Sequence, residues 1–314
     1  MRSLHSLALL SASVITSGLL VMLSHAWIVP LRRPLFGIYE PLASGVQNSQ
    51  LDLDVLFLNW NDRHATSRLH RFLAQAQRRG RLPLLTVEPF VDSAPGDSVA
   101  DLSAHVLAGH YDRIIANLTS VLSEHQGPIL LRFGHEMDKT GQYPWALDDS
   151  ERFIAIYRYF HYKVQSKARH VVWVWSPAGV SSADRFWPGH QYVDVIGLSI
   201  YASRSWTSDG SLESFGSQLR NKIRLQRLFR KPVLLAEVGV SGSAADQQRW
   251  IHDAVHTLAS YPEVCGLVYF QAQQPSWMPL ATGHENWQLK EPALQWLLTH
   301  RRLEPRHGLS CVED

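Results

Sequence analysis

The sequence predicts an α/β fold in which one domain forms a closed (β/α)8 barrel, the TIM-barrel architecture. Three observations indicate this. Short apolar runs alternate with amphipathic stretches, eight such runs can be counted, and no linker rich in Ser, Gly or Pro interrupts them. Alternation of this kind is typical of parallel strands joined by helical crossovers. A barrel needs roughly 250 residues, and the chain of 314 residues is long enough for a barrel and an N-terminal leader.

The first 26 residues have the pattern of an export signal. Arg2 is followed by a mainly apolar run over residues 7 to 23, and then by the small residues Ser24 and Ala26. This order is typical of a secretory signal peptide. The apolar run, about 17 residues, also reaches the lower limit for a membrane span, so retention as a single-pass inner-membrane anchor stays open beside cleavage. In both cases the folded domain is expected outside the cytoplasm, periplasmic or secreted.

The eight expected strands follow the leader. They lie near residues 35–40, 53–60, 82–90, 129–136, 170–176, 193–201, 233–239 and 265–271. Helical signals lie at 67–79, 112–124, 150–167, 212–229, 245–260 and 291–301. The first crossover and the link before the sixth strand are short and have the weakest helical signals. We expect one domain over 33–303 and a tail over 304–314.

The composition and the absent motifs exclude several functions. Thirty basic and 28 acidic residues leave a charge of +2, and no basic block is present that would bind a run of phosphates. Nucleic acid is therefore not expected as a partner. Serine-hydrolase, nucleotide and dinucleotide motifs are missing, so no cofactor is expected. A zinc protease motif would need a histidine where Lys139 stands, so no metal is expected either.

The two cysteines leave two interpretations open. Cys265 and Cys311 would pair in an oxidising compartment. Alternatively, Cys265 is a small buried residue, because it lies in an apolar run. We expect a monomer.

Two glutamates stand where apolar strands run out. Glu136 follows the fourth expected strand and Glu237 lies at the end of the seventh. A barrel carries its active site at the carboxyl ends of its strands, and these two strands face each other across the mouth. Retaining glycosidases need two carboxyl groups about 5 to 5.5 Å apart. Each glutamate alone has a second interpretation, as an N-cap or a surface charge, but together they predict a hydrolase that cleaves sugars.

Tryptophans give separate support, because indole rings stack on the apolar faces of sugars. Seven of the eleven tryptophans fall at or just beyond expected strand ends: Trp60, Trp145, Trp175, Trp187, Trp206, Trp277 and Trp287. The alternative is that they pack loops against the barrel. We expect a stacking cleft on this face, with Trp60 and Trp175 among its substrate-binding residues.

Several segments together resemble glycoside hydrolase family 26, whose members include β-mannanases and some β-glucanases. Residues 132–137 read RFGHEM and residues 143–145 read YPW. Similar segments follow in the family's order: 174–177 (VWSP), 187–189 (WPG), 192–198 (YVDVIGL), 231–239 (KPVLLAEVG), 266–270 (GLVYF) and 286–287 (NW). The resemblance covers most of the chain beyond the leader.

The resemblance implies a retaining endo-β-glycanase and gives roles to individual residues. Glu136 would be the general acid and base, and Glu237 the nucleophile that forms a glycosyl-enzyme intermediate. His135 and Tyr201 would touch the sugar or orient Glu237. Trp145 and Trp287 would be platforms around the scissile bond.

Physical chemistry adds expectations about the surroundings of the two carboxyl groups. A general acid keeps its proton against apolar and aromatic surface, whereas a nucleophile stays ionised when donors hydrogen-bond to it. Tyr201 and Arg132 are the expected donors to Glu237. Arg132 also shares the inward parity of Glu136, and an arginine inside a barrel must be paired. Glu88, at the end of the third strand, is its expected partner and would support the site.

Three positions depart from the family's mannanase pattern. Asp138, Ser199 and Gln288 stand where asparagine, aspartate and arginine are usual, and they are expected substrate contacts. A β-mannan, a mixed-linkage glucan and a self-made exopolysaccharide therefore all stay open as the substrate. Two other functions also stay open: a non-catalytic glycan-binding subunit of a polysaccharide synthesis or export system, and a transglycosylase.

Overall fold

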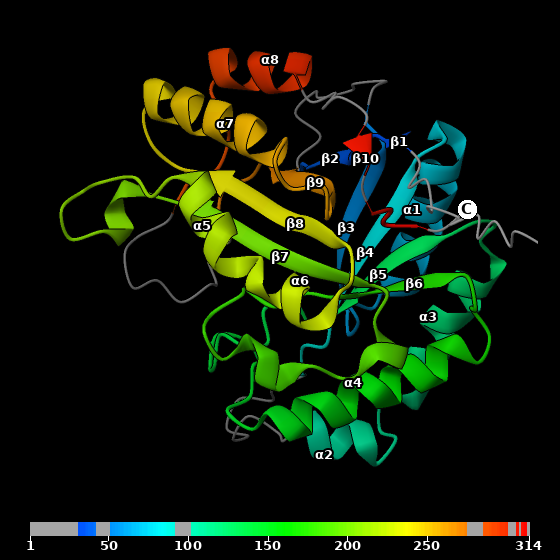
Figure 1. Cartoon of the computed structure of the whole chain (residues 1–314). Coiled ribbons are helices and arrows are strands. Elements are labelled where there is room, and N and C mark those ends of the chain that lie inside the picture. The colour runs from blue at the N-terminus through cyan, green and yellow to red at the C-terminus, as the bar shows by residue number, and fades with distance from the viewer. Residues whose placement is uncertain are drawn as a thin grey trace, which may run out of the picture.

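Eight parallel strands close into a barrel, which confirms the predicted architecture (Figure 1). This computed structural model describes residues 31–41, 51–91, 102–274, 285–300, 306–307 and 309–312. The barrel strands are β2 (Leu35–Tyr39), β3 (Leu53–Asn59), β4 (Leu82–Glu88), β5 (Ile129–Phe133), β6 (Val171–Trp175), β7 (Val195–Ala202), β8 (Val233–Val240) and β9 (Val264–Phe270). β9 pairs in parallel with β2 and completes the ring.

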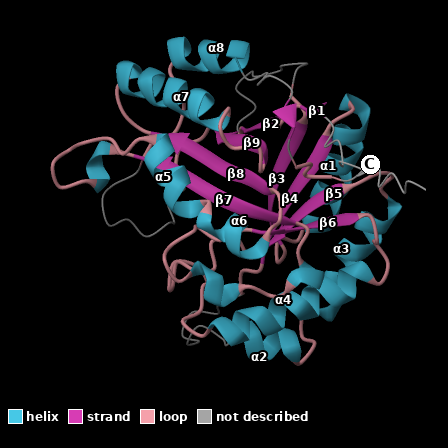
Figure 2. Cartoon of the chain, viewed as in Figure 1, coloured by secondary structure: helices cyan, strands magenta, loops and turns pink. Residues whose placement is uncertain are grey.

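Helices surround the strands, as Figure 2 shows. They are α1 (Ala65–Arg79), α2 (Leu102–Leu107), α3 (Asp112–Glu124), α4 (Ser150–Gln165), α5 (Phe215–Lys222), α6 (Arg224–Phe229), α7 (Ala244–Leu258) and α8 (Glu291–His300). The sequence did not predict the short α2. The single helix expected over 212–229 is wrong in two respects. The Ser214 side chain accepts a hydrogen bond from Ser217 N and starts the helix there, and Ile223 separates α5 from α6.

The link between β6 and β7 has no α-helix, in agreement with its weak helical signal. Two short 3-10 helices occupy it, η1 (Ala183–Phe186) and η2 (His190–Tyr192). Trp187 lies between them and stacks on Phe229 of α6, with ring centroids 4.0 Å apart. Aromatic packing thus covers the barrel where a crossover helix is missing.

The end of the barrel away from the active-site mouth is closed by apolar side chains and a disulfide. Cys265 at the start of β9 is bonded to Cys311, which settles the two interpretations of these cysteines in favour of pairing. A two-stranded sheet of β1 (Leu31–Arg32) and β10 (Arg306–His307) was not predicted. Part of the expected tail is therefore attached to the barrel.

The expected leader lies outside the described residues. Among the residues that are described, no helix combines the length and the apolar composition that a membrane span needs. The proposed domain boundaries at 33, 303 and 304 stay predictions.

A register shift in β8 turns Glu237 into the barrel. Leu234 and Ala236 belong to the inner apolar cluster, whereas Leu235 and Val238 pack in the outer one. Strict alternation would therefore point Glu237 outward. The pairing with β7 shifts between Leu198 and Ser199, so that Ser199 pairs with Glu237, and two successive residues face inward. Glu237 thus lies within β8, three residues before its end, and not at the strand end that the sequence predicted.

Candidate active site

A pocket opens where the carboxyl ends of the strands meet. Three carboxyl groups line it, from Glu88, Glu136 and Glu237. Its aromatic lining consists of Tyr39, Phe57, Tyr143, Tyr201, Trp206, Phe270 and Trp287. The remaining lining residues are Asn59, Arg68, His135, Lys139, Gln142 and Gln274. The structure therefore brings together the two glutamates that 101 positions separate in sequence.

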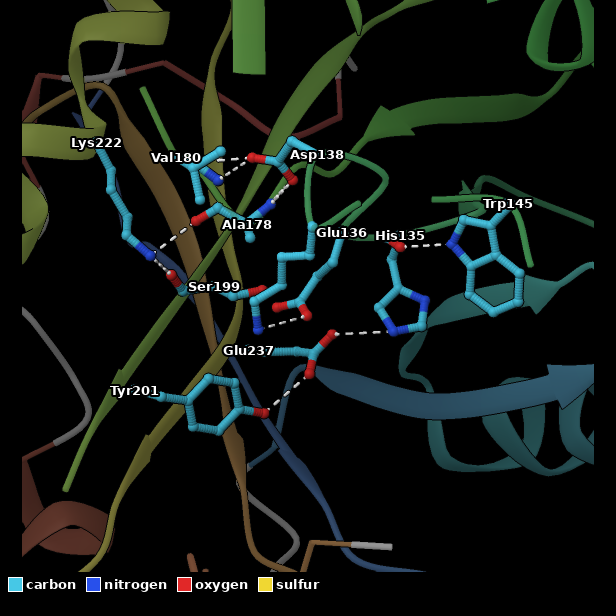
Figure 3. Close-up of polar contacts among 12 residues, drawn as sticks. His135, Glu136, Asp138, Trp145, Ala178, Val180, Ser199, Tyr201, Lys222 and Glu237 are labelled. Carbon is cyan, nitrogen blue, oxygen red and sulfur yellow. Dashed lines mark hydrogen bonds and ion pairs between the residues drawn. The ribbon is translucent and has the colours of Figure 1, made fainter. Parts of the chain in front are cut away.

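Two donors hold the carboxylate of Glu237. Arg132 Nη2 donates to Oε1 at 2.8 Å. The Tyr201 hydroxyl donates to Oε2 at 2.8 Å (Figure 3). These are the two contacts that the sequence predicted. Burial raises the pKa of Glu237, and the charge of Arg132 and the two hydrogen bonds oppose that rise. The carboxylate is fixed in position by bonds to both of its oxygens.

Arg132 is not paired with Glu88, so that expectation was wrong. The guanidinium is fully buried and donates to Thr86 Oγ1 at 2.8 Å, to Ser176 Oγ at 3.3 Å and to Glu237. Inward parity predicted its place in the barrel, but the register shift in β8 supplies a nearer carboxylate. Burial, and then repulsion from Glu237, raises the pKa of Glu88 to about 7.

Glu136 lies in a tight turn beyond β5. Its φ of 52° is in the left-handed region, which non-glycine residues rarely adopt. Its N–H donates to the Ser176 carbonyl at 2.7 Å, and its own carbonyl accepts from Lys139 N at 3.0 Å. Such backbone strain persists only where the surroundings fix it, and it is concentrated at functional sites. The turn aims the carboxylate of Glu136 into the pocket.

The surroundings of Glu136 differ from the expected apolar surface. Lys139 Nζ lies 3.3 Å from Glu136 Oε2 and forms an ion pair. Burial alone would raise the pKa of Glu136, but the positive charge of Lys139, together with His135, Ser199 and Lys222, outweighs burial and lowers that pKa. This ion pair favours the ionised form of Glu136, which differs from the protonated carboxyl that the sequence predicted.

His135 lies beside Glu237 as a neutral ring. Its Nε2 is 4.0 Å from Glu237 Oε1. Burial, followed by repulsion from Arg132, lowers the pKa of His135 to about 3. Trp145 Nε1 donates to the His135 carbonyl at 2.7 Å and so fixes the backbone of this residue. His135 thus contributes a polar, uncharged wall to the pocket.

Most of the expected tryptophan cleft is packing. Trp60 stacks on Tyr111, Trp145 stacks on Tyr143, and Trp175 packs against Trp187. None of these four tryptophans lines the pocket. Their rings fill the space between the barrel and its loops, as the alternative interpretation held.

Two tryptophans do line the pocket. The rings of Trp206 and Trp287 lie with centroids 5.4 Å apart, and Trp287 also contacts Tyr201 at 4.7 Å. Trp206 is 46% exposed, which leaves its ring available for contact with a bound molecule. The expected position of Trp277 lies outside the described residues.

Asp138 anchors the Glu136 turn and does not line the pocket. Its carboxylate accepts from the N–H groups of Ala178, Gly179 and Val180 at 2.6, 2.9 and 3.0 Å. The buried ammonium of Lys222 in turn donates to the Ala178 carbonyl at 2.7 Å (Figure 3). Both oxygens of Asp138 are therefore taken up within the protein, and the expected substrate contact is not present.

Asp138→Asn should accordingly affect stability and turnover more than substrate affinity. The amide keeps one accepting oxygen and replaces the other with a donor, so at least one charge-assisted bond to the 178–180 backbone is lost. We expect the free energy of unfolding in urea to fall by about 2 to 4 kcal/mol. We also expect a lower kcat and a nearly unchanged KM. Asp148→Asn, an exposed carboxylate on the same loop, is the control. A raised KM at unchanged stability would restore the substrate-contact hypothesis.

The sequence analysis did not identify several pocket residues. Tyr39, Phe57 and Phe270 form an aromatic floor, with Tyr39 at 4.7 Å from Phe57 and 4.9 Å from Phe270. Tyr39 and Phe270 are the last residues of β2 and β9. An aromatic residue at the end of an expected strand could have indicated their place in the pocket. Lys139 and Arg68 have no such signal, because their place depends on a turn and a helix.

A closed parallel barrel with two buried glutamates in an aromatic pocket at its carboxyl-terminal mouth is the arrangement of enzymes that cleave glycosidic bonds. The chain belongs to glycosyl hydrolase family 26, whose model matches residues 87–271, from β4 to the end of β9. The resemblance to this family is therefore confirmed.

Curated relatives and solved structures agree with this family. Over 242 residues the chain is 24% identical to Endoglucanase H of Acetivibrio thermocellus, covering 72% of the chain and 25% of that protein. Over 190 residues it is 28% identical to Mannan endo-1,4-beta-mannosidase of Bacillus subtilis, covering 54% and 47%. The chain thus spans a quarter to a half of these relatives. A GH26 beta-mannanase from Bacteroides ovatus has the same fold, with a TM-score of 0.63 at 17% identity over 90% of this chain and 93% of that one.

Proposed function

We propose that the protein is a retaining endo-β-glycanase in which Glu237 is the nucleophile and Glu136 the general acid and base. The observation that carries this assignment is the unequal treatment of two carboxylates in one pocket. Glu237 is fixed by Arg132 and Tyr201 through both of its oxygens. Glu136 is held at Oε2 by Lys139, whose side chain is partly exposed. A nucleophile needs a fixed, ionised carboxylate, and an acid/base needs access to a proton.

The reaction then proceeds in two displacements. Glu237 attacks the anomeric carbon while Glu136 gives its proton to the departing glycosidic oxygen, and a covalent glycosyl-enzyme forms. Glu136, now ionised, takes a proton from water, and the resulting hydroxide attacks the same carbon. Glu237 is released as a carboxylate, Glu136 is protonated again, and the anomeric configuration is retained.

The substrate is a β-linked polysaccharide of the mannan or glucan type. The relatives include an endoglucanase and a mannan endo-1,4-beta-mannosidase, which supports both classes. The aromatic floor of Tyr39, Phe57 and Phe270, with Trp206 and Trp287, provides apolar surface for sugar rings. Ser199 and Gln288, which depart from the family's mannanase pattern, do not line the pocket.

Export is part of the same proposal. It is supported by the first 26 residues, in which a basic residue is followed by an apolar run and then by small residues. The proposal includes both cleavage of this leader and its retention as an anchor. A disulfide between Cys265 and Cys311 agrees with an oxidising compartment. The proposal also takes the protein to act as a monomer on an extracellular or periplasmic glycan.

A panel of glycans tests the proposed activity. Purified protein is incubated with mannan, glucomannan, mixed-linkage glucan, laminarin and xylan, and the products are separated by size. We expect mixed oligosaccharides from mannan, glucomannan or mixed-linkage glucan, because an endo-acting enzyme cleaves inside the chain. When an oligosaccharide is added as acceptor, products longer than that acceptor would indicate transglycosylation. Monosaccharide as the sole product would contradict endo action, and cleavage of none of the glycans would contradict the substrate class.

A further inference from the structure

Lys139 is a cation placed directly on the carboxylate that must act as the acid. The two side chains differ in exposure: that of Glu136 is 5% exposed and that of Lys139 is 40% exposed. The Glu136 side chain is therefore confined by its neighbours, whereas the Lys139 ammonium can turn toward the open pocket. A Lys ammonium has three donors, and Lys139 Nζ uses one of them, to Glu136, among the described residues.

The backbone below Lys139 is rigid. Its N–H closes the turn to the Glu136 carbonyl at 3.0 Å, and the next residue toward the N-terminus is Asp138, which is bound to three backbone N–H groups. The Lys139 side chain can therefore change conformation while its backbone, three residues after Glu136, stays in place. It lines the pocket beside Gln142 and Tyr143.

Among the charged groups around Glu136, Lys139 is the one whose side chain can move. The charged and titratable groups facing it come from its own segment, from β7, from α5 and from β8: His135, Asp138, Lys139, Tyr143, Tyr201, Lys222 and Glu237. Lys222 is held by the Ala178 and Ser199 carbonyls at 2.7 and 2.5 Å. Asp138 and Glu237 are held by the bonds described above.

The ion pair opposes acid catalysis as long as it persists. The adjacent ammonium stabilises the ionised carboxylate of Glu136. The protonated form, which must donate to the leaving oxygen, is therefore less populated. If Lys139 turned away, the largest charge that opposes the effect of burial would be removed, and the pKa of Glu136 would rise. A substrate group that draws off the ammonium would therefore prepare Glu136 for the reaction.

We infer that Lys139 forms a carboxylate-binding subsite, and that the preferred substrate is a β-glycan carrying uronic acid residues next to the cleaved bond. The inference rests on the proposed function and names its substrate class more closely. Lys139 already binds a carboxylate, that of Glu136. The substrate carboxylate takes the place of Glu136 as the partner of the ammonium, and Glu136 then takes up a proton from solvent. Apart from the O–H bond that this proton forms on Glu136, only hydrogen bonds and ion pairs change in this exchange.

Arg68, the other cation that lines the pocket, is a poorer candidate for this subsite. Its Nη1 lies 2.7 Å from Asp62 Oδ2 and is bound there. It belongs to α1, on the side of the pocket formed by Asn59 and Glu88. The cation paired with Glu136 is Lys139 and not Arg68, so a ligand held by Arg68 would not release the acid.

The experiment compares one glycan in three forms. The neutral glycan that the enzyme cleaves is used unmodified, with part of its C6 hydroxymethyl groups oxidised to carboxylates, and with those carboxylates converted to methyl esters. Wild type, Lys139→Gln, Lys139→Arg and the control Lys163→Gln are assayed for kcat/KM across pH. Lys163 forms an ion pair with Asp112 at 2.7 Å on α4, outside the pocket.

We expect wild type to prefer the carboxylate form over the ester by roughly 10-fold or more, because a charge-assisted contact is gained. Lys139→Gln should lose that preference, Lys139→Arg should keep part of it, and Lys163→Gln should resemble wild type. On the neutral glycan, Lys139→Gln should move the alkaline limb of the pH profile to higher pH, since removal of the ammonium raises the pKa of Glu136.

Two results would overturn the inference: equal rates of wild type on the carboxylate and ester forms, or a preference that survives in Lys139→Gln. Failure of the proposed function looks different, because wild type would then cleave none of the three forms. An unchanged alkaline limb in Lys139→Gln would show that Lys139 does not control the proton on Glu136, which also contradicts the inference.

Discussion

Glu237→Gln is expected to lower kcat on a β-glycan by roughly 10⁴-fold or more, a loss like that for removal of a covalent nucleophile in other hydrolases. The amide cannot form the glycosyl-enzyme, so the first displacement fails. Glutamine keeps an oxygen that can accept from Arg132 or Tyr201, and the buried guanidinium is not left without a partner. Folding and glycan binding should therefore remain, which urea unfolding and affinity electrophoresis in a glycan gel measure.

Glu285→Gln is a matched control for that variant. Glu285 is also a buried glutamate, it is hydrogen-bonded to Ser205, and it does not line the pocket. Its replacement should leave kcat close to that of wild type. Turnover of Glu237→Gln within 10-fold of wild type, in a preparation free of wild-type protein, would rule out the nucleophile assignment.

Glu136→Ala should separate the two steps of the reaction. Without the acid, cleavage of a natural glycosidic bond is expected to slow by about 10²- to 10⁴-fold. An aryl glycoside with a good leaving group needs little protonation, so it should still form the glycosyl-enzyme. The second step then lacks its base, and the intermediate accumulates.

Azide provides the check on Glu136→Ala. It is a small anionic nucleophile that needs no base, and the alanine leaves room for it. Added azide should speed turnover of the aryl glycoside and give a glycosyl azide of retained configuration, which NMR identifies. Wild type should show no such acceleration. Absence of both the acceleration and the azide product would argue against the acid/base role of Glu136.

Much of the barrel could be predicted from the sequence because its strands are buried on both faces. Runs such as 233–239 and 265–271 are nearly all apolar, and the structure places strands there. The two glutamates stand out against these runs, so their convergence in one pocket could be anticipated. The class of enzyme followed from the same residues, since the carboxyl ends of barrel strands meet at one mouth.

The surroundings of the two glutamates could be predicted only in part. The alternation of inward and outward residues along β5 placed Arg132 inside the barrel. Its partner depends on the register shift in β8, which the sequence of that strand does not indicate. The ion pair of Lys139 with Glu136 depends on a left-handed turn at Glu136. Both features arise from three-dimensional packing and have no local signal in the chain.

Tryptophans show why residue type at a strand end was insufficient. Trp145 and Trp287 both follow barrel strands, yet Trp145 is enclosed by Tyr143 and Phe90, whereas Trp287 lines the pocket. Which side of a large ring meets solvent depends on loops that are distant in sequence. Asp138 is a comparable case, because its partners lie 40 residues further along the chain.

Covalent trapping tests the central claim most directly. A 2-deoxy-2-fluoro glycosyl fluoride slows both displacements but keeps a good leaving group, so the glycosyl-enzyme of a retaining enzyme accumulates. We predict a mass increase of one fluoroglycosyl group on the intact protein, and peptide mapping should place it on Glu237. Label on Glu136 or Glu88, or the absence of any label on a preparation that cleaves its glycan, would contradict the account.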